Sequence, residues 1–295
     1  MMNKFYFSAI IMALVSLVAC NKEGVQTVGE TLSANAYISS GTKTVYAADT
    51  DEKGNPIVKV TWSDEDSFKA YYEGSKNPIN FSKKAAGSSF SATDVPAGVT
   101  ASTTFTGLYG SAATLNSDGK IDIDFSKQNG ELKNLAAYDV MTATSTLDEG
   151  MLSFAFKHNC AILRLKCVNY TINPVGKVKL YFWKAQVSEE FGSTGLNKKI
   201  NSPNYSLSIN LKTLSDKGSS LKGQGSVTYR YVIVPAMSYL EPAPGIESMP
   251  IVDELDAFLK QIDFSNKKFI EAGKVYDVLC ECGVEADEDG WIWGD

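Results

Sequence analysis

Short runs of β-branched and aromatic residues, separated by turn-forming residues, are the feature that most constrains the fold of this chain. Such runs are typical of antiparallel sheets, because β-branched and aromatic residues favour strands while Gly, Asn, Asp, Ser and Pro end them. Representative runs are 57–62 (IVKVTW), 103–109 (TTFTGLY), 177–182 (KVKLYF), 229–234 (YRYVIV) and 275–280 (VYDVLC). Over 295 residues this spacing predicts an all-β protein built from antiparallel sandwiches or barrels.

Only one segment has a helical period. Its apolar residues follow Pro250 at the spacing of one helix face, and they are Ile251, Leu255, Phe258, Leu259 and Ile262. We therefore expect one or two short helices within the all-β chain.

The clearest single strand lies near the middle of the chain. Leu152, Phe154 and Phe156 alternate with smaller or polar residues, but beyond His158 the apolar positions shift by one residue. A period of two changes face only through a bulge or a crossing between sheets, so a bend is predicted near His158–Cys160. His158 is the single histidine, and we interpret it as a structural residue that satisfies buried backbone groups at this bend.

The charge distribution excludes several classes of function. The formal net charge is −6, and six acidic residues with no Lys or Arg lie between 281 and 295. A chain whose charges balance before residue 281, and whose tail is acidic, is poorly suited to bind nucleic acid, because such binding needs clustered basic residues. One histidine argues against His-based catalysis and multi-His metal sites. The sequence predicts a non-enzyme with no catalytic residues, metal or cofactor.

The first residues resemble an export signal. Lys4 precedes a short apolar stretch that ends in Leu17-Val18-Ala19-Cys20, the pattern that lipoprotein signal peptidase cuts before cysteine. We predict a signal peptide over 1–19 and acyl chains such as palmitate on Cys20, the alternative being an ordinary secretory leader with a chance cysteine. Several acyl chains anchor a protein stably. Residues 21–22 lack the aspartate that retains lipoproteins at the inner membrane, so the prediction is a surface-exposed protein of the cell outer membrane.

The other cysteines are Cys160, Cys167, Cys280 and Cys282. Export exposes them to an oxidising compartment, which leaves their redox state open. Their spacing suits neither an unstrained disulfide nor a metal cluster, so we interpret most of them as small core-facing residues.

Five segments, in this order, resemble the fimbrillin family, the type V pilus subunits and related surface lipoproteins of Bacteroides-like bacteria. They are 60–68 (VTWSDEDSF), 138–143 (YDVMTA), 152–163 (LSFAFKHNCAIL), 233–235 (IVP) and 272–276 (AGKVY). The resemblance implies two tandem transthyretin-like β-sandwich domains. The expected divisions are a lipid-anchored flexible segment 20–34, an N-terminal sandwich 35–148, a C-terminal sandwich 149–282 and an acidic tail 283–295.

The resemblance also implies assembly by donor-strand exchange into a fimbrium, with other pilus subunits as partners and a role in adhesion. A surface protease removes an N-terminal strand, and a strand from another subunit fills the groove. Family members are typically cut after arginine, whereas no arginine precedes Arg164 here, so Lys43 is the nearest basic alternative.

Two alternatives remain open from the sequence. Trp291, Ile292 and Trp293 are either a donor-strand anchor or a tail packed on its own domain. The whole chain is either a stalk, tip or anchor subunit of a pilus, or a non-polymerising surface lipoprotein that binds glycan or a host ligand.

Overall fold

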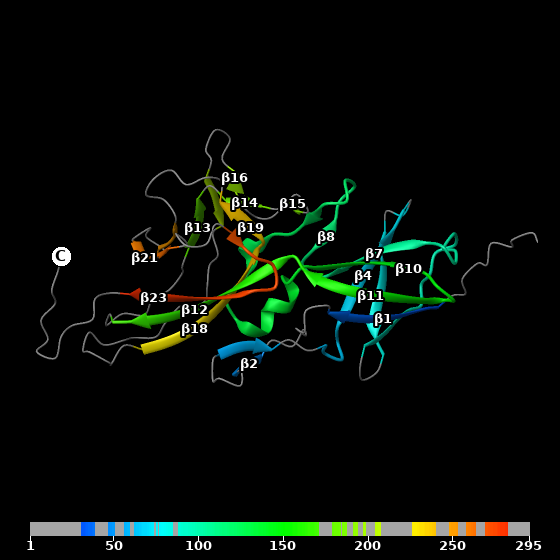
Figure 1. Cartoon of the computed structure of the whole chain (residues 1–295), viewed down its shortest axis with the longest axis horizontal. Coiled ribbons are helices and arrows are strands. Elements are labelled where there is room, and N and C mark those ends of the chain that lie inside the picture. Colours follow the sequence, from blue (N-terminus) through cyan, green and yellow to red (C-terminus); the bar gives the residue numbers. More distant parts are fainter. Residues whose placement is uncertain are drawn as a thin grey trace, which may run out of the picture.

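The computed structural model describes the chain in separate ranges. These are 31–38, 47–50, 56–59, 62–73, 75, 77–84, 88–170, 179–183, 185–187, 191–193, 197–198, 204–207, 226–239, 248–252, 258–263 and 269–282. Strands dominate these ranges, which confirms the all-β prediction. Figure 1 shows β1, β4, β7, β10 and β11 on the right and β12, β13, β18, β21 and β23 on the left.

Seven strands of the first half form a closed barrel, here called the N-terminal barrel, in the order β1-β11-β10-β7-β4-β5-β6. Their bounds are β1 (Leu32–Ile38), β4 (Ser67–Tyr72), β5 (Ile79–Lys83), β6 (Ser89–Ala92), β7 (Thr104–Tyr109), β10 (Met141–Thr146) and β11 (Met151–His158). All hydrogen-bonded neighbours are antiparallel except β1 and β11, which run parallel. The two tandem transthyretin-like sandwiches stay a prediction.

Aromatic side chains fill the N-terminal barrel. Phe68 stacks on Phe81 with ring centroids 5.0 Å apart, and it meets Phe90 and Phe154 edge-on at 5.1 Å. Trp62 packs edge-on against Phe90 at 5.3 Å. Edge-to-face and offset pairs are the favoured geometries of aromatic rings, so this cluster fixes the barrel interior beyond simple burial.

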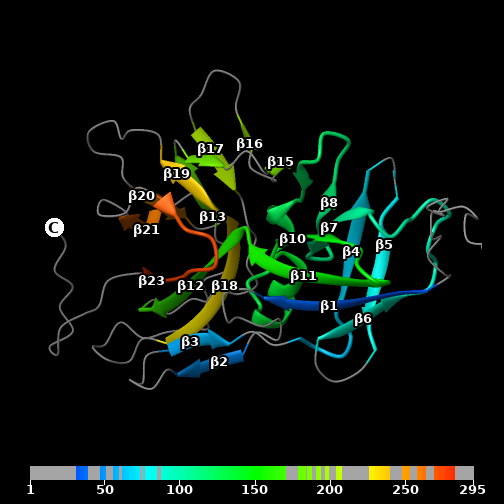
Figure 2. The same cartoon turned by 45° about the vertical axis from the view of Figure 1, so that its right-hand side comes forward.

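The predicted bend between the two halves of the middle strand is confirmed. β11 ends at His158, and β12 (Cys160–Asn169) starts after a single non-strand residue. β12 belongs to a different sheet, ordered β18-β12-β23, with β18 (Ser226–Pro235) antiparallel and β23 (Val275–Cys282) parallel to it. The chain therefore crosses from one sheet to another at Asn159, as Figure 2 shows for the β11 and β12 ribbons.

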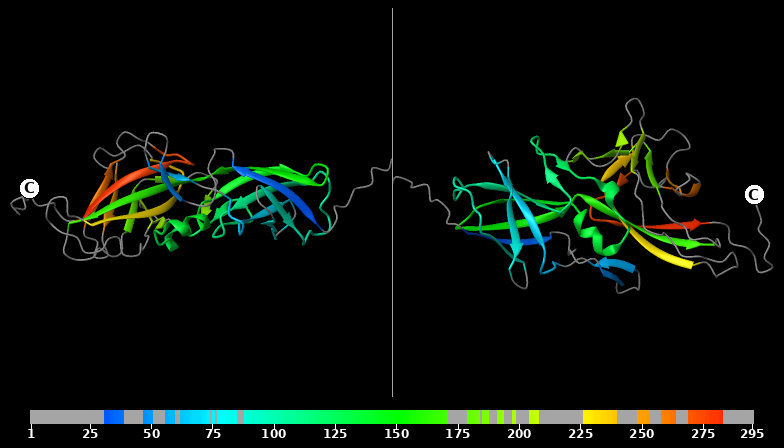
Figure 3. Two further views of the ribbon diagram at one scale, coloured as in Figure 1. Left: turned by 90° about the horizontal axis from the view of Figure 1, so that it is seen from below. Right: turned by 180° about the vertical axis from the view of Figure 1, so that it is seen from behind.

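The remaining strands form four smaller sheets, ordered β16-β17-β13-β20-β21, β14-β19-β22, β15-β9-β8 and β2-β3. Their bounds are β2 (Ala47–Thr50), β3 (Pro56–Lys59), β8 (Thr114–Leu115), β9 (Ile121–Asp122), β13 (Lys179–Trp183), β14 (Ala185–Val187), β15 (Phe191–Ser193), β16 (Asn197–Lys198), β17 (Asn204–Leu207), β19 (Met237–Tyr239), β20 (Ser248–Val252), β21 (Phe258–Asp263) and β22 (Phe269–Ile270). Figure 3 shows the strands of the second half of the chain beside the β18-β12-β23 sheet, whereas β8 lies near the barrel, with the Leu115 amide donating to the Tyr71 hydroxyl at 3.4 Å.

The helix predicted around residues 251–262 is wrong. β20 and β21 lie in this segment and pair antiparallel, with Pro250 opposite Gln261. β20 also pairs with β13, so cross-strand contacts outweigh a helical period carried by only a few apolar residues. Within the described ranges, helix is limited to the two 3-10 helices η1 (Phe125–Lys127) and η2 (Leu132–Ala137).

A second hydrophobic core lies between the β18-β12-β23 sheet and the segment that carries the 3-10 helices. Phe125 and Leu135 from the helices are buried in it with Leu163, Leu165 and Val232 from the sheet. The two cores correspond to two packing units, but the predicted domain bounds stay a prediction. Backbone pairing places Met151–His158 in the N-terminal barrel, and β1 begins at Leu32.

Candidate functional site

Strand β1 closes the N-terminal barrel. It pairs in parallel with β11 over Ser33 to Ile38, and it pairs antiparallel with β6 over Leu32 to Asn35. Beyond that register, the Ala36 amide donates to the Ser88 carbonyl at 2.9 Å. The first described strand of the chain is therefore hydrogen-bonded along both of its edges.

The sequence of β1, LSANAYI, alternates between the barrel interior and the surface. Leu32, Ala34 and Ala36 are fully or almost fully buried, whereas Tyr37 points outward with 49% of its surface exposed. This alternation is the pattern of a strand with one face on a core. Only one face of β1 therefore contributes apolar burial to the barrel.

Small side chains on the inner face of β1 make room for large ones on its neighbours. Ala34 lies opposite Phe90 of β6 and Leu152 of β11, and Ala36 lies opposite Phe154. Paired residues share a face of the sheet, so each alanine sits beside a bulky neighbour, and such alternation of size lets a core fill densely. The inner face of β1 therefore borders the aromatic side chains of Phe90 and Phe154.

The strands that pair with β1 determine which surfaces of the barrel its removal would expose. Removing the strand leaves the edges of β6 and β11 without their partner and exposes apolar side chains beneath. Unpaired strand edges beside an apolar groove accept an added strand, since main-chain hydrogen bonds and alternate side-chain pockets are both restored.

A buried ion pair holds the end of β11. His158 Nδ1 lies 2.9 Å from both carboxylate oxygens of Asp139, and the two side chains are 7% and 3% exposed. Burial lowers the pKa of His158, but the hydrogen bond and the charge of Asp139 raise it by more, so the net shift is upward. The predicted contact of His158 with buried backbone groups stays a prediction, whereas the structure shows its ring nitrogen bonded to the Asp139 carboxylate.

Of the described cysteines, Cys160 lies at the crossing between the sheets, whereas Cys167 and Cys280 lie opposite each other farther along β12 and β23. Cys160, Cys167 and Cys280 are all buried, which confirms the prediction of core-facing cysteines for these three. Burial and the nearby charge of Asp139 raise the pKa of Cys160 well above its ordinary value. A protonated, enclosed thiol of this kind is an inert packing group.

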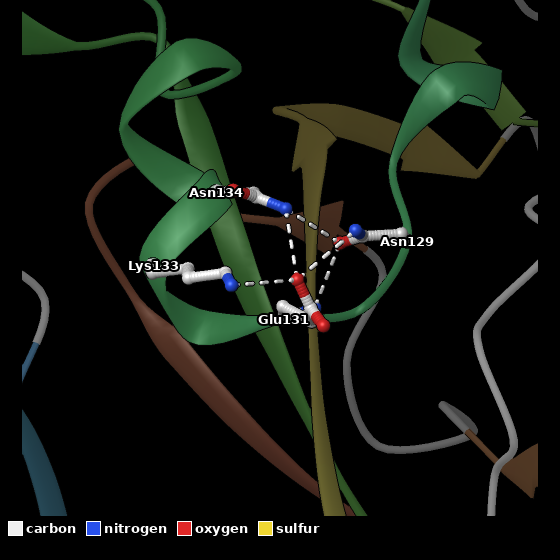
Figure 4. A network of polar contacts seen from close by, with 4 residues as sticks. All are labelled: Asn129, Glu131, Lys133 and Asn134. Carbon is white, nitrogen blue, oxygen red and sulfur yellow. Dashed lines mark hydrogen bonds and ion pairs between the residues drawn. The ribbon is translucent and has the colours of Figure 1, made fainter.

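A polar pocket with a volume of about 450 Å³ lies beside the 3-10 helices. Asn129, Lys133 and Asn134 line it and belong, with Glu131, to a hydrogen-bonded network, shown in Figure 4, that we call the amide network. Asn129 Oδ1 accepts from the Glu131 amide at 3.1 Å and from Asn134 Nδ2 at 3.0 Å. Glu131 Oε2 accepts from Asn129 Nδ2 and Asn134 Nδ2, each at 3.2 Å, and lies 3.5 Å from Lys133 Nζ.

The loop that carries this network is tied to strand β18. The buried Gln128 side chain donates from Nε2 to the Ile233 carbonyl and accepts from the Ile233 amide, both at 2.7 Å. The Gly130 carbonyl accepts from the Tyr231 amide at 2.9 Å. These contacts fix the pocket wall on the edge of β18. The residues of this pocket could not be predicted from the sequence, because polar residues in a short loop have no recognisable spacing.

The sequence-predicted site residues all lie outside the described residues. Cys20, Lys43, Trp291, Ile292 and Trp293 belong to this group, and their roles stay predictions. Among the described residues, no group of three or more His, Cys, Asp or Glu side chains is placed to hold a metal ion. None of the helices in the described part of the chain is long and apolar enough to cross a membrane.

Comparison with known proteins gives structural similarities alone. No family model and no curated protein matches the sequence. A candidate cell adhesion protein from Bacteroides ovatus is 14% identical, with 84% of this chain and 91% of that chain covered and a TM-score of 0.43. A fimbrial protein from the same species is 15% identical, with 85% and 48% covered and a TM-score of 0.35.

A third solved structure is the fimbrial anchor protein Mfa2 from Porphyromonas gingivalis. It is 9% identical, with 85% of this chain and 90% of that chain covered and a TM-score of 0.36. These neighbours are described as fimbrial and cell-adhesion proteins. These similarities are distant, and the functions of those proteins are not transferred to this chain.

Proposed function

We propose that this chain is a fimbrillin-like structural subunit of a surface pilus, exported as a lipoprotein and assembled by strand exchange. One observation carries the proposal: β1, at the N-terminal end of the described chain, is held between β6 and β11 against the aromatic side chains of the barrel core. A strand at this end can leave after a single cut, because the sheet continues from β4 onward without it. Cys20 upstream supplies the anchor, and Lys43 downstream supplies the cutting site.

The proposal gives the chain two states. Uncut, it stays attached to the outer membrane through Cys20 and serves as a base or accessory subunit. Cut after Lys43, it loses the anchor and β1 together, and the open groove takes a strand from another pilus subunit. The Trp291–Trp293 segment is the candidate donor anchor. The two packing units would then be the two tandem transthyretin-like domains of a subunit that supports adhesion.

Limited proteolysis tests the proposal. Endoproteinase Lys-C is applied to the purified full chain, and the products are followed by mass spectrometry and by unheated SDS gels. We expect a cut after Lys43 followed by a ladder of SDS-resistant oligomers. Lys43→Ala should remain uncut there and monomeric, while Lys157→Ala, on the outer face of β11, should behave as the unmodified chain. A trimmed chain that stays monomeric would refute the proposed assembly by strand exchange.

The lipid anchor is tested separately. Cys20→Ala should move the protein from the membrane fraction to the soluble fraction, because the acyl chains need the cysteine sulfur. An unchanged distribution would refute the anchor and leave the strand-exchange test unaffected.

A further inference from the structure

We propose that the pocket beside the 3-10 helices binds an uncharged saccharide unit, through the amide network and the half-buried ring of Tyr138. The polar lining consists of Ser111, Lys127, Asn129, Lys133, Asn134 and Tyr138, and the cavity volume is about 450 Å³. Small-molecule sites occupy about 300–1,000 Å³, so this cavity is large enough for one or two sugar rings. This inference does not depend on strand exchange, because the pocket lies away from β1.

The charges of the pocket balance. Lys127 Nζ lies 3.6 Å from Asp124 Oδ2, and Lys133 Nζ lies 3.5 Å from Glu131 Oε2. Both lysine side chains are three-quarters exposed, and each positive charge has a carboxylate beside it. The two carboxylates do not line the pocket, but each lies beside a lining lysine and offsets its positive charge. The pocket therefore favours a ligand without net charge.

Donors and acceptors alternate around the pocket. Lysine ammonium groups only donate, carboxylates only accept, and amides, hydroxyls and the phenol supply both kinds of group. Neighbouring sugar hydroxyls also donate and accept in alternation, so they match such a lining better than a purely apolar or purely ionic ligand does. The Asn134 amide shows the arrangement: its NH₂ group already donates to Asn129 and Glu131, which orients its carbonyl oxygen as an acceptor.

One side of the pocket is apolar. Ala136, Ala137 and the ring of Tyr138 contribute this side, and Tyr138 also packs against the second hydrophobic core. An aromatic ring with a polar tip suits ligands that have an apolar face and hydroxyl groups at their edge, as a sugar ring has. Burial raises the pKa of Tyr138 and the charge of Asp124 raises it further, so the phenol stays a neutral donor.

Hydrogen bonds hold the polar side of the pocket in place without a ligand. Its two amide side chains are held by the amide network, and the loop below is tied to β18 through Gln128 and Gly130. Leu135 of η2 is buried in the second core. Ligand binding then orders few additional side chains, which reduces its entropic cost.

Saturation-transfer NMR on the uncut full chain tests the proposal. The chain is kept in a detergent without a sugar headgroup, and the probes are lactose, N-acetyllactosamine and mannobiose, with sialyllactose as the acidic comparator. We expect at least one neutral probe to bind with a Kd on the order of 1 mM, the weak end of specific binding. Asn134→Ala and the exposed Lys133→Met should each weaken it about tenfold, the effect of losing one or two hydrogen bonds.

The matched control is Lys157→Met, which removes an exposed lysine from β11 and should leave binding unchanged. Lys133→Met keeps the test valid if Asn134→Ala fails to fold, since Lys133 is 77% exposed. Three results would overturn the inference: no transfer to any neutral probe, equal binding by all variants, or sialyllactose binding about tenfold more tightly than lactose. Each of these results leaves the proteolysis test of strand exchange untouched.

Discussion

Truncating Leu32 tests whether β1 is an integral strand of the N-terminal barrel. Leu32 is the first residue of β1, it is fully buried, and it lies opposite Ala92 of β6. Leu32→Ala removes three carbon-sized groups from the barrel core while leaving every backbone hydrogen bond of β1 in place. The change therefore isolates the apolar contribution of the strand from its main-chain pairing.

The expected loss is large for one substitution. Removing three buried carbon groups costs about 2.4 kcal/mol of transfer free energy at about 0.8 kcal/mol each. The cavity left behind adds to this, and measured Leu→Ala changes in cores span about 2–5 kcal/mol. Domains of ordinary stability have unfolding free energies of about 5–15 kcal/mol, so the variant should lose a substantial fraction.

Urea unfolding, followed by tryptophan fluorescence, measures the effect. Trp62 reports on the barrel, because its ring lies 5.3 Å from Phe90. The midpoint should fall by about 1–2 M urea for Leu32→Ala. Ser33→Ala, at the adjacent exposed position, should change the unfolding free energy by about 0.5 kcal/mol or less. Equal midpoints for the two variants would refute the assignment of β1 to the core.

Three further predictions concern other parts of the fold. Because the pKa of His158 is raised, its interaction with Asp139 stabilises the fold fully below the unfolded pKa of about 6.5, and this stabilisation is lost as pH rises through the folded pKa. Urea unfolding midpoints measured across this pH range should show the loss. The variant His158→Gln should abolish this pH dependence. Gly107→Ala places a Cβ 2.9 Å from a core phenyl carbon and should cost about 1–3 kcal/mol in calorimetry. Gln128→Ala leaves the buried amide and carbonyl of Ile233 without this partner and should cost about 1–3 kcal/mol for each group in urea unfolding, whereas an unchanged midpoint would contradict the role of this side chain.

The strand pattern of the middle of the chain could be predicted from the sequence. Leu152, Phe154 and Phe156 are buried as their alternation indicates, and the shift of the pattern after His158 corresponds to the crossing between sheets. These predictions succeed because period-two burial is a local property that large side chains make visible. Arg164 is charged but nevertheless buried, and it pairs with Asp277.

Other features depend on contacts that the sequence does not display. The apolar spacing after Pro250 indicates a helix, but this segment forms strands because β20 pairs with β13 and β21. β1 has weak sequence signals, because Ala34 and Ala36 are small and its register depends on β6 and β11. The amide network is equally hidden, since its residues acquire a common site only when β18 fixes their loop.

Hydrogen–deuterium exchange on β6 and β11 tests strand exchange most directly. Their amides, in the segments Ser89–Ala92 and Met151–His158, are measured in the intact chain, in the trimmed monomer and in the SDS-resistant oligomer. Strand exchange predicts protection in the intact chain, faster exchange after β1 is removed, and renewed protection in the oligomer. Unchanged protection in the trimmed monomer, or exchange in the oligomer as fast as in that monomer, would contradict it.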